Sequence, residues 1–122
     1  MSAMNIEQAR FNMIEQQIRP WDVLDDRVLQ VISGTPREAF VPERYRALAF
    51  SDISIPLEHG EVMMPPKLEG KLLQSITLQH ADSVLEIGTG SGYLTACLAR
   101  LAGQVHSVDI HADFVEQART RL

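Results

Sequence analysis

One stretch of this sequence decides the fold: Val84-Leu85-Glu86-Ile87-Gly88-Thr89-Gly90-Ser91-Gly92-Tyr93. Its first part is apolar apart from one acid, its middle has glycine at every second position, and an amphipathic run over 93–101 follows. This order predicts a strand, a tight turn and a helix. Glycine lacks a Cβ and allows positive φ, so the turn can approach a ligand, and the first N–H groups of the helix can bind a carboxylate of that ligand. The stretch therefore predicts a small-molecule site.

The spacing of the glycines indicates which kind of molecule. A dinucleotide turn has a third glycine three residues after the second, a position that holds Tyr93 here. Glycine stands at 92 instead, and the pattern E-x-G-x-G-x-G over 86–92 resembles motif I of the class I S-adenosylmethionine-dependent methyltransferases. The next predicted strand ends in Asp109, 21 positions after Gly88, where an acid can accept both ribose hydroxyls. A packing turn without a ligand is the alternative, and Asp109 favours the nucleoside site.

Size and composition describe a soluble globular domain. The chain has 122 residues, 45% of them hydrophobic, and a net charge of −5, which fits one domain. No two basic residues are adjacent, so no stripe for a phosphate backbone is predicted and nucleic acid is not expected as a partner. Residues 1–10 carry no signal-peptide pattern, and no apolar run is long enough to span a bilayer. We therefore expect a cytoplasmic protein without a membrane partner.

Cysteine and histidine usage predicts no metal site. The single Cys97 shares apolar helical spacing with Leu94, Leu98 and Leu101, which favours a buried reduced thiol over a nucleophile. Three of the histidines, at 80, 106 and 111, are not at metal-ligand spacing. His59 is either a surface histidine without a role or a contact for an acceptor.

The N-terminal half predicts mainly helices. Residues 5–18 form one amphipathic helix that Pro20 ends, with Ile6, Ala9, Met13, Ile14, Gln17 and Ile18 on its apolar face. Asp25 is the predicted N-cap of a second helix whose apolar residues are Val28, Leu29 and Ile32. A short edge strand over 52–57 and a third helix from Pro66 to about Gln79 follow. The inner face of the third helix is predicted at Leu68, Leu72, Leu73 and Ile76.

From residue 81 the pattern changes to alternating strands and helices. The predicted elements are a strand over 83–87, a helix over 92–102, a strand over 104–109 and a helix over 112–122. This βαβα order predicts an α/β fold with a parallel sheet. We therefore divide the chain into an N-terminal helical segment with a loop, 1–80, and the start of an α/β ligand-binding domain, 81–122.

A parallel sheet of two strands is thin, because parallel strands are usually buried on both faces. The last helical pattern still runs at Leu122 without a glycine stop signal. Two interpretations stay open: a product truncated before further strand–helix units, or a homo-oligomer in which two chains complete one sheet.

Several motifs in order resemble one family. They are Met13-Ile14-Glu15-Gln16-Gln17-Ile18, Asp26-Arg27-Val28-Leu29, Pro36-Arg37-Glu38-Ala39-Phe40-Val41-Pro42, Ala49-Phe50-Ser51-Asp52, Ile55-Pro56-Leu57 and the glycine stretch 84–93. Together they resemble the N-terminal part of the protein-L-isoaspartate O-methyltransferases, from about Asn5 onward. The resemblance implies a Rossmann-like class I methyltransferase fold, truncated after the second strand–helix unit and preceded by an N-terminal helical segment.

The resemblance also implies a cofactor and a reaction. S-adenosyl-L-methionine would donate a methyl group to the α-carboxyl of isoaspartyl residues in damaged proteins, which is a repair activity. A carboxylate is already ionised at neutral pH, so no general base is required, and positioning can supply most of the acceleration. The cofactor-binding residues implied are Glu86 below the turn, Gly88, Thr89, Gly90, Ser91 and Gly92 in it, Asp109 on the ribose, and Ile110 and His111 beside the adenine.

One loop departs from the family. After His59 the chain reads Gly60-Glu61-Val62-Met63-Met64-Pro65-Pro66, whereas the family's acceptor loop resembles Gly-Gln-Thr-Ile-Ser-Gln-Pro. Met64 takes the place of the serine at the catalytic position, Val62 that of the threonine and Pro65 that of the second glutamine. Each lost donor to a buried carboxylate costs roughly 1–3 kcal/mol, so we expect isoaspartyl binding to be weak or absent.

Two hypotheses follow from the family and its altered loop. The first is an isoaspartyl methyltransferase. The second is a relative that is non-catalytic or acts on another acceptor, and that binds only S-adenosylmethionine or a partner. Met63 and Met64 either line an acceptor pocket or fill the core.

Overall fold

The N-terminal helix is longer and less regular than its sequence pattern indicates. In the computed structural model, which describes residues 3–122, α1 (Ala3–Met13) continues into a π-helical turn (Ile14–Ile18) and a 3₁₀ turn (Arg19–Trp21). The predicted end of this helix is confirmed, since the π-helical turn ends at Ile18 and Pro20 lies in the separate 3₁₀ turn that follows. The helical run ends at Asp22, which has a left-handed φ of 62°.

The predicted apolar face of this helix is confirmed. Met13, Ile14 and Ile18 are buried, and the remaining predicted members are half-buried. Arg10 is also buried on this face, where its Nη2 donates to Glu38 Oε2 at 2.6 Å. The buried face of this helix therefore includes Arg10, paired with Glu38, in addition to the predicted apolar residues.

The second helix and its cap are also confirmed. Asp25 precedes α2 (Asp26–Gly34), and its Oδ1 accepts a hydrogen bond from Val28 N at 3.1 Å. The predicted apolar residues Val28, Leu29 and Ile32 are buried. Two 3₁₀ turns, Arg37–Phe40 and Glu43–Leu48, then lead to the hairpin.

The region predicted as an edge strand followed by a loop is a small hairpin. β1 (Ile55–Pro56) pairs antiparallel with β2 (Val62–Met63), and Ile55 lies opposite Met63. The observed strand is shorter than the predicted 52–57, and β2 lies inside the predicted loop. Sequence reasoning missed β2 because two residues are too few to carry an alternating pattern.

The third helix, α3 (Pro66–Ile76), begins with Pro66 in its first turn, as predicted. Its predicted inner face is wrong at three of four positions: Leu73 is buried, but Leu68, Leu72 and Ile76 are exposed. The face toward the core carries Glu69 and Gly70 instead.

Both of these residues have a physical reason to be buried. Glu69 forms an ion pair with Arg37. A Cβ on Gly70 would lie 3.1 Å from Ile18 Cγ2, so glycine allows α3 to approach the first helix closely. An acid and a glycine are invisible to a search for apolar spacing, which explains the error.

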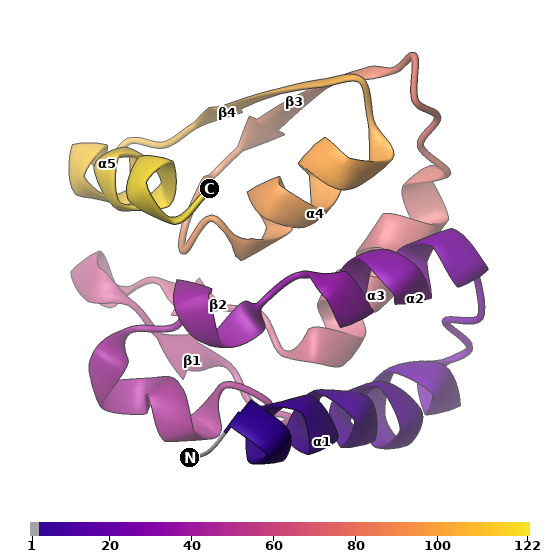
Figure 1. Cartoon of the computed structure of the whole chain (residues 1–122). Helices are drawn as coiled ribbons and strands as arrows, with labels where there is room; N and C mark the ends of the chain where they lie inside the picture. The colour runs from indigo at the N-terminus through magenta and orange to yellow at the C-terminus, as the bar shows by residue number, and fades with distance from the viewer. Residues whose placement is uncertain (1–2) are drawn as a thin grey trace.

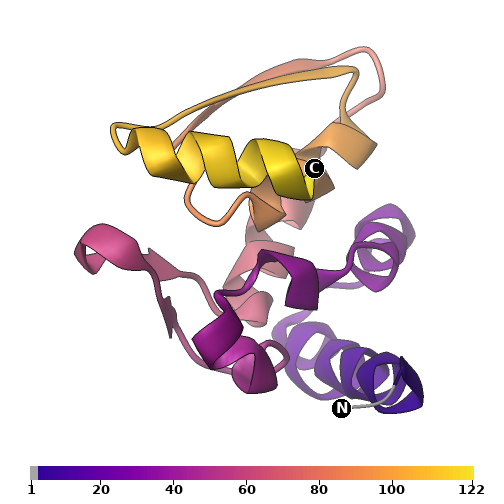
Figure 2. The ribbon, with the colours of Figure 1, turned by 60° about the vertical axis from the view of Figure 1, so that its left-hand side comes forward.

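The βαβα order predicted for the rest of the chain is confirmed. β3 (Ser83–Ile87) and β4 (Gln104–Val108) pair in parallel, with Ser83 opposite Gln104 and Ile87 opposite Val108. The helices α4 (Tyr93–Leu101) and α5 (Ala112–Arg121) follow the two strands. Figures 1 and 2 show both helices on one side of this sheet, between it and the N-terminal elements.

The other face of the sheet is open. Val84, Glu86, Val105 and Ser107 point toward the helices and are buried or half-buried, whereas Leu85, Ile87 and Val108 are exposed. Ile87 is 83% exposed. The thin sheet predicted from two strands is therefore covered on one face only.

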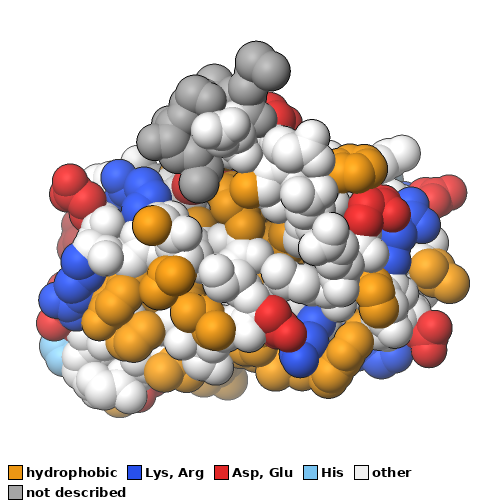
Figure 3. All heavy atoms as spheres, turned by 90° about the horizontal axis from the view of Figure 1, so that it is seen from below, with side chains coloured by type: hydrophobic (Ala, Val, Ile, Leu, Met, Phe, Trp, Pro, Cys, Tyr) orange, Lys and Arg blue, Asp and Glu red, His pale blue; other side chains and the backbone are white. Residues whose placement is uncertain are grey.

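One core connects the N-terminal elements with the βαβα unit. Its buried side chains come from both sides of residue 80, among them Ile32, Phe40, Leu73, Leu98 and Phe114. The surface beneath α1 mixes hydrophobic and charged side chains (Figure 3). Within residues 3–122, no helix has the length and apolar character needed to cross a bilayer.

Candidate functional site

The glycine turn adopts the conformation that only glycine adopts readily. Gly88, Gly90 and Gly92 have φ values of 104°, 53° and 89°, all in the region that side chains disfavour. The turn is fixed to the end of β4, because Val108 O accepts hydrogen bonds from Gly88 N at 2.7 Å and Thr89 N at 3.1 Å. The backbone therefore presents a rigid, side-chain-free surface at the carboxyl ends of both strands.

The three glycines have different surroundings. A Cβ on Gly88 would meet no heavy atom within 4 Å, and one on Gly90 would meet only Leu57 Cδ1, at 3.8 Å. A Cβ on Gly92 would lie 2.9 Å from Ala118 Cβ. Gly88 thus leaves open space beside the backbone, Gly90 has Leu57 at ordinary contact distance, and Gly92 lets α5 pack against the turn.

Asp109 lies beside the turn, as its sequence position predicts. Its Oδ2 accepts a hydrogen bond from Gly90 N at 3.0 Å and its Oδ1 accepts one from His111 N at 2.9 Å. Burial raises the pKa of Asp109, but these backbone hydrogen bonds outweigh burial and leave its pKa below the ordinary value. The carboxylate is therefore ionised at neutral pH and retains lone pairs for further donors.

Glu86 lies beneath the turn in a network of hydroxyl groups. Its carboxylate accepts hydrogen bonds from Thr95 and from Ser107 Oγ at 2.6 Å, and Ser107 Oγ is in turn 2.6 Å from Thr89 Oγ1. Burial raises the pKa of Glu86 above its ordinary value. This network ties β3, β4, α4 and the turn together.

The side chains of Thr89 and Ser91 also serve the turn itself. Both residues are buried, and Ser91 Oγ accepts a hydrogen bond from Tyr93 N at 3.2 Å. Any ligand contact from these two positions would therefore come mainly from their backbone atoms.

Of the two residues predicted to lie beside the adenine, one is exposed to solvent and the other contacts the hairpin. Ile110 is 92% exposed. The ring of His111 stacks in parallel on the ring of His59, with 4.0 Å between centroids, and Phe114 meets both rings edge-on. The structure thus brings together two histidines that the sequence assigns to opposite sides of the site.

His59 connects the hairpin to α5. Its φ is 62°, and its Nε2 lies 2.9 Å from both carboxylate oxygens of Asp113. The hydrogen bond with His59 lowers the pKa of Asp113. Sequence reasoning missed Asp113, because nothing local relates it to a histidine 54 positions earlier.

The acceptor-side residues differ in exposure. Gly60 has a φ of 73° and open space beside it, and Glu61 and Val62 are exposed. Met63 is 4% exposed and belongs to the core. Of the two alternatives for this residue, core filling therefore agrees with the structure better than an acceptor pocket. Met64 is half-buried, and its carbonyl accepts a hydrogen bond from Arg37 Nη2 at 2.9 Å.

Arg37 is a second residue near the site that sequence reasoning did not single out. It is fully buried, pairs through Nη1 with Glu69 and donates from Nε to Ala49 O at 2.7 Å. Burial raises the pKa of Glu69 to about 7, against the opposing effect of the Arg37 charge. No sequence signal distinguishes this pair from surface charges.

Cys97 is buried and free, as predicted. Burial raises the pKa of its thiol to about 12. A thiol with this pKa carries almost no thiolate at neutral pH and is a poor nucleophile.

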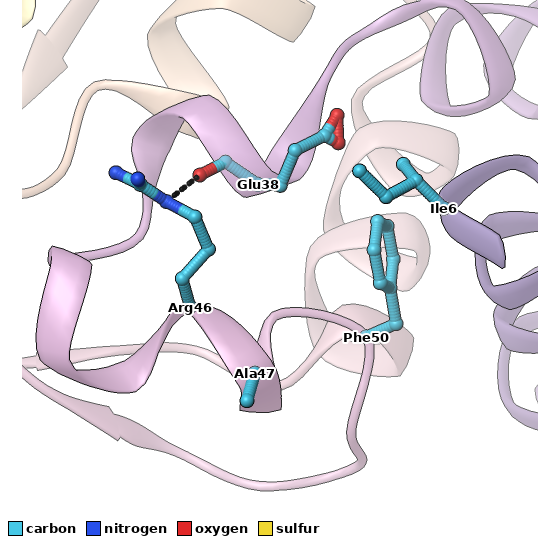
Figure 4. Close-up of a pocket in the computed structure, with 5 residues that line it drawn as sticks. All are labelled: Ile6, Glu38, Arg46, Ala47 and Phe50. Carbon is cyan, nitrogen blue, oxygen red and sulfur yellow. Dashed lines mark hydrogen bonds between the residues drawn. The ribbon is translucent and has the colours of Figure 1, made fainter. Parts of the chain in front are cut away.

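Two hollows differ in their relation to the turn. One, of about 220 Å³, borders the turn and has Leu57, Glu58, Ser91 and Phe114 in its lining. The other, of about 310 Å³, lies away from every predicted site residue. Figure 4 shows Ile6 and Phe50 on one side of it and the stem of Arg46, bound to Glu38 O, on the other.

A glycine turn after a first parallel strand, with an acid at the end of the second, is characteristic of the Rossmann-like fold of class I methyltransferases. Two solved structures share the fold. One is a protein-L-isoaspartate O-methyltransferase chain from Plasmodium falciparum in complex with S-adenosyl-L-homocysteine, with a TM-score of 0.76, 19% identity and coverage of 95% of this chain and 54% of that chain. The other is a protein-L-isoaspartate O-methyltransferase with a TM-score of 0.73, 23% identity and coverage of 94% and 37%.

Sequence comparison identifies the family. The profile of Protein-L-isoaspartate(D-aspartate) O-methyltransferase (PCMT) matches residues 8–122, and the chain belongs to this family. A relative from Koribacter versatilis is 38% identical over 113 residues, covering 93% of this chain and 51% of its own. A relative from Aeropyrum pernix is 38% identical over 118 residues, covering 94% and 45%. The chain spans about half the length of the curated relatives that it matches.

Proposed function

We propose that the protein is an S-adenosylmethionine-dependent methyltransferase that methylates isoaspartyl carboxyl groups of damaged proteins. The observation that carries this proposal is the hydrogen bond between Asp109 and Gly90 N, which joins the predicted ribose acid to the predicted cofactor turn. Membership of the PCMT family supports it, as does the S-adenosyl-L-homocysteine bound to the Plasmodium relative.

The turn fits a nucleoside that carries an amino-acid tail. Gly88 offers backbone beside open space, Asp109 offers an ionised carboxylate for ribose hydroxyls, and Ile110 offers an exposed apolar side chain for the adenine. The ring of His111 stacks on His59 with one face, and we propose that the adenine lies next to this ring. S-adenosylmethionine supplies a methyl group on a sulfonium, which a carboxylate can accept without a general base. The chain therefore has to bind the methyl donor, orient it toward the acceptor and exclude water from the site.

The acceptor side fits an isoaspartyl carboxylate less well. Val62 and Met64 offer no side-chain donor where the family has threonine and serine. The competing function is therefore a relative that binds the nucleoside but methylates another acceptor or none. A nicotinamide enzyme is disfavoured, because Tyr93 occupies the third-glycine position and is fully buried there.

Calorimetric titration with S-adenosyl-L-homocysteine, with NADH as a control ligand, tests the cofactor assignment. We expect micromolar binding of the first and none of the second. Asp109→Ala should weaken binding about 10-fold or more, as expected for a lost hydrogen-bonded acid, while Asp26→Ala, an exposed acid on α2, should not. Absence of binding by the unaltered chain would exclude a working cofactor site in it.

Methylation of an isoaspartyl peptide tests the acceptor. The unaltered protein and a Val62→Thr/Met64→Ser variant would be compared with radiolabelled S-adenosylmethionine. Higher transfer by the variant would identify residues 62 and 64 as the cause of weak acceptor binding. Cofactor binding without transfer by either protein would favour the competing function.

The remaining assignments stay part of the proposal. They are a protein or peptide as the partner, the absence of nucleic-acid and membrane partners, cytoplasmic location, a possible homo-oligomer, and the division of the chain near residue 80. The open apolar face of the β3–β4 sheet is consistent with a further packing partner.

A further inference from the structure

Arg37 is a buried cation whose contacts all lie in other segments. Its side chain is fully buried, its Nε donates to Ala49 O at 2.7 Å, its Nη2 donates to Met64 O at 2.9 Å, and its Nη1 pairs with Glu69. Its Cζ lies 4.8 Å from the centre of the Tyr93 ring. One guanidinium therefore contacts four separate segments.

These segments are the parts that a methyl-transfer site has to align. Met64 lies in the acceptor-side loop, and Glu69 lies on α3 directly after that loop. Tyr93 is the first residue of α4 and follows the last glycine of the turn. Because the guanidinium is planar and its donors diverge at fixed angles, it fixes the relative positions of the groups it binds.

From this geometry we infer that Arg37, held by Glu69, is a positioning residue that sets the backbone of the acceptor-side loop at Met64 relative to the cofactor turn; the inference rests on the proposed methyl transfer. The contacts of Arg37 are with Ala49, Glu69, the Met64 carbonyl and the Tyr93 ring, none of which is a predicted cofactor-binding residue. Arg37 acts through the Met64 carbonyl and the Tyr93 ring.

Packing alone does not explain why a charged pair, Arg37 with Glu69, is buried here. Replacing a buried ion pair by apolar side chains of similar size is often neutral or stabilising, so an Arg–Glu pair is not needed to fill a core. Apolar side chains could not donate to the carbonyls of Ala49 and Met64. Since a displacement of about 1 Å between reacting groups can lower a rate roughly 100-fold, an oriented donor to the Met64 carbonyl is valuable in this site.

Other contacts also join the hairpin to the cofactor side, and Leu57, like Arg37, is buried. Leu57 Cδ1 would lie 3.8 Å from a Cβ on Gly90, and His59 stacks on His111 near the surface. Neither contact reaches residue 64. Among these contacts, the one made by the Met64 backbone itself is the hydrogen bond from Arg37.

The test uses Arg37→Lys and the double variant Arg37→Met/Glu69→Leu in the whole chain. Lysine keeps the positive charge but loses the divergent N–H donors of the guanidinium. The double variant replaces both charged side chains by apolar ones of similar size. Arg10→Lys is the matched control, because Arg10 is a second buried arginine that pairs with Glu38 and has no contact with the loop. If Arg37→Lys does not fold, the double variant carries the test.

Hydrogen exchange of the amides of 58–64 is the first readout, with 83–87 as an internal reference. We expect both Arg37 variants to raise exchange in 58–64 about tenfold or more, as for a locally released segment, and to leave 83–87 unchanged. An unchanged loop, or an equal increase in Arg10→Lys, would overturn the inference. This readout does not depend on activity, so it remains decisive if the proposed function fails.

Kinetics provide the second readout where the unaltered protein methylates an acceptor. We expect kcat/KM for the acceptor to fall about 100-fold in the Arg37 variants while the affinity for S-adenosyl-L-homocysteine is retained. Parallel loss of both would mean a general structural role and would overturn the inference. Failure of the unaltered protein to bind S-adenosyl-L-homocysteine would instead contradict the proposed function alone.

Discussion

Replacing Gly92 by alanine would test whether the third glycine of the turn serves the packing of α5. At a φ of 89°, alanine costs about 1–2 kcal/mol in backbone strain. The new Cβ would lie 2.9 Å from Ala118 Cβ and 3.3 Å from Ala118 Cα, so α5 would have to shift, and overpacking of this kind costs about 1–3 kcal/mol. We therefore expect Gly92→Ala to lower the free energy of unfolding by about 2–5 kcal/mol in total.

Two further variants separate strain from overpacking. Gly88 has a comparable φ of 104° but no heavy atom within 4 Å of a built Cβ, so Gly88→Ala should cost only the strain of about 1–2 kcal/mol. Ala118→Gly removes the closest contact and leaves the one at 3.3 Å. Combined with Gly92→Ala, it should therefore recover about 1–2 kcal/mol as a coupling energy.

Urea unfolding followed by circular dichroism is measured for five proteins, with linear extrapolation to water: the unaltered chain, the three single variants and the double variant. The reasoning would be refuted if Gly92→Ala cost no more than Gly88→Ala and showed no coupling with Ala118→Gly. Gly92 would then be required for the ligand or for the turn alone. A change in the slope of the urea dependence would indicate an altered native or unfolded state rather than a local clash.

Three other predictions concern buried or capping side chains. Because burial raises the pKa of Glu69 from 4.5 to about 7, its protonated form stabilises the fold below about pH 4.5, and this contribution is lost as the pH rises through 7. The free energy of unfolding should fall by up to about 3 kcal/mol across that range relative to Glu69→Gln; parallel pH profiles of the two proteins would contradict this. The Cys97 thiol, with a pKa of about 12, should react with iodoacetamide only after unfolding, and mass spectrometry with and without urea checks this; rapid labelling of the native protein would be inconsistent with its burial. Asp25→Ala should lower the free energy of unfolding by about 1 kcal/mol through loss of the cap on α2, whereas Asp26→Ala should change it little, and equal effects would argue against a capping role.

The parts of the fold that could be predicted are those whose signal is local. The glycine turn, the N-cap at Asp25 and the βαβα order each depend on residues within a few positions of one another, and all three agree with the structure. The position of Asp109 beside Gly90 could also be predicted, because adjacent parallel strands end at the same edge of a sheet. Local spacing therefore determines the part of the fold that we propose as the cofactor site.

The parts that could not be predicted depend on contacts between distant segments. Arg37 and Glu69 are 32 positions apart, and His59 and Asp113 are 54 positions apart. Before folding, nothing in the sequence distinguishes these charged side chains from solvent-exposed ones. The inner face of α3 was misassigned for the same reason, since its position is decided by the partner of Glu69 and by the close approach at Gly70 rather than by the leucines.

Contacts between distant segments also explain why the hairpin keeps a defined backbone although residues 62 and 64 lack the polar side chains of the family. Met63 is held by burial and by its pairing with Ile55, and Met64 is held through its carbonyl by Arg37. Neither contact uses the side chain of residue 62 or 64, and Val62 points to solvent. The backbone of the acceptor loop is thus specified independently of the groups that would bind the acceptor. If the proposed function holds, substitutions at positions 62 and 64 would change the acceptor without changing the fold, whereas a change at Arg37 would alter both.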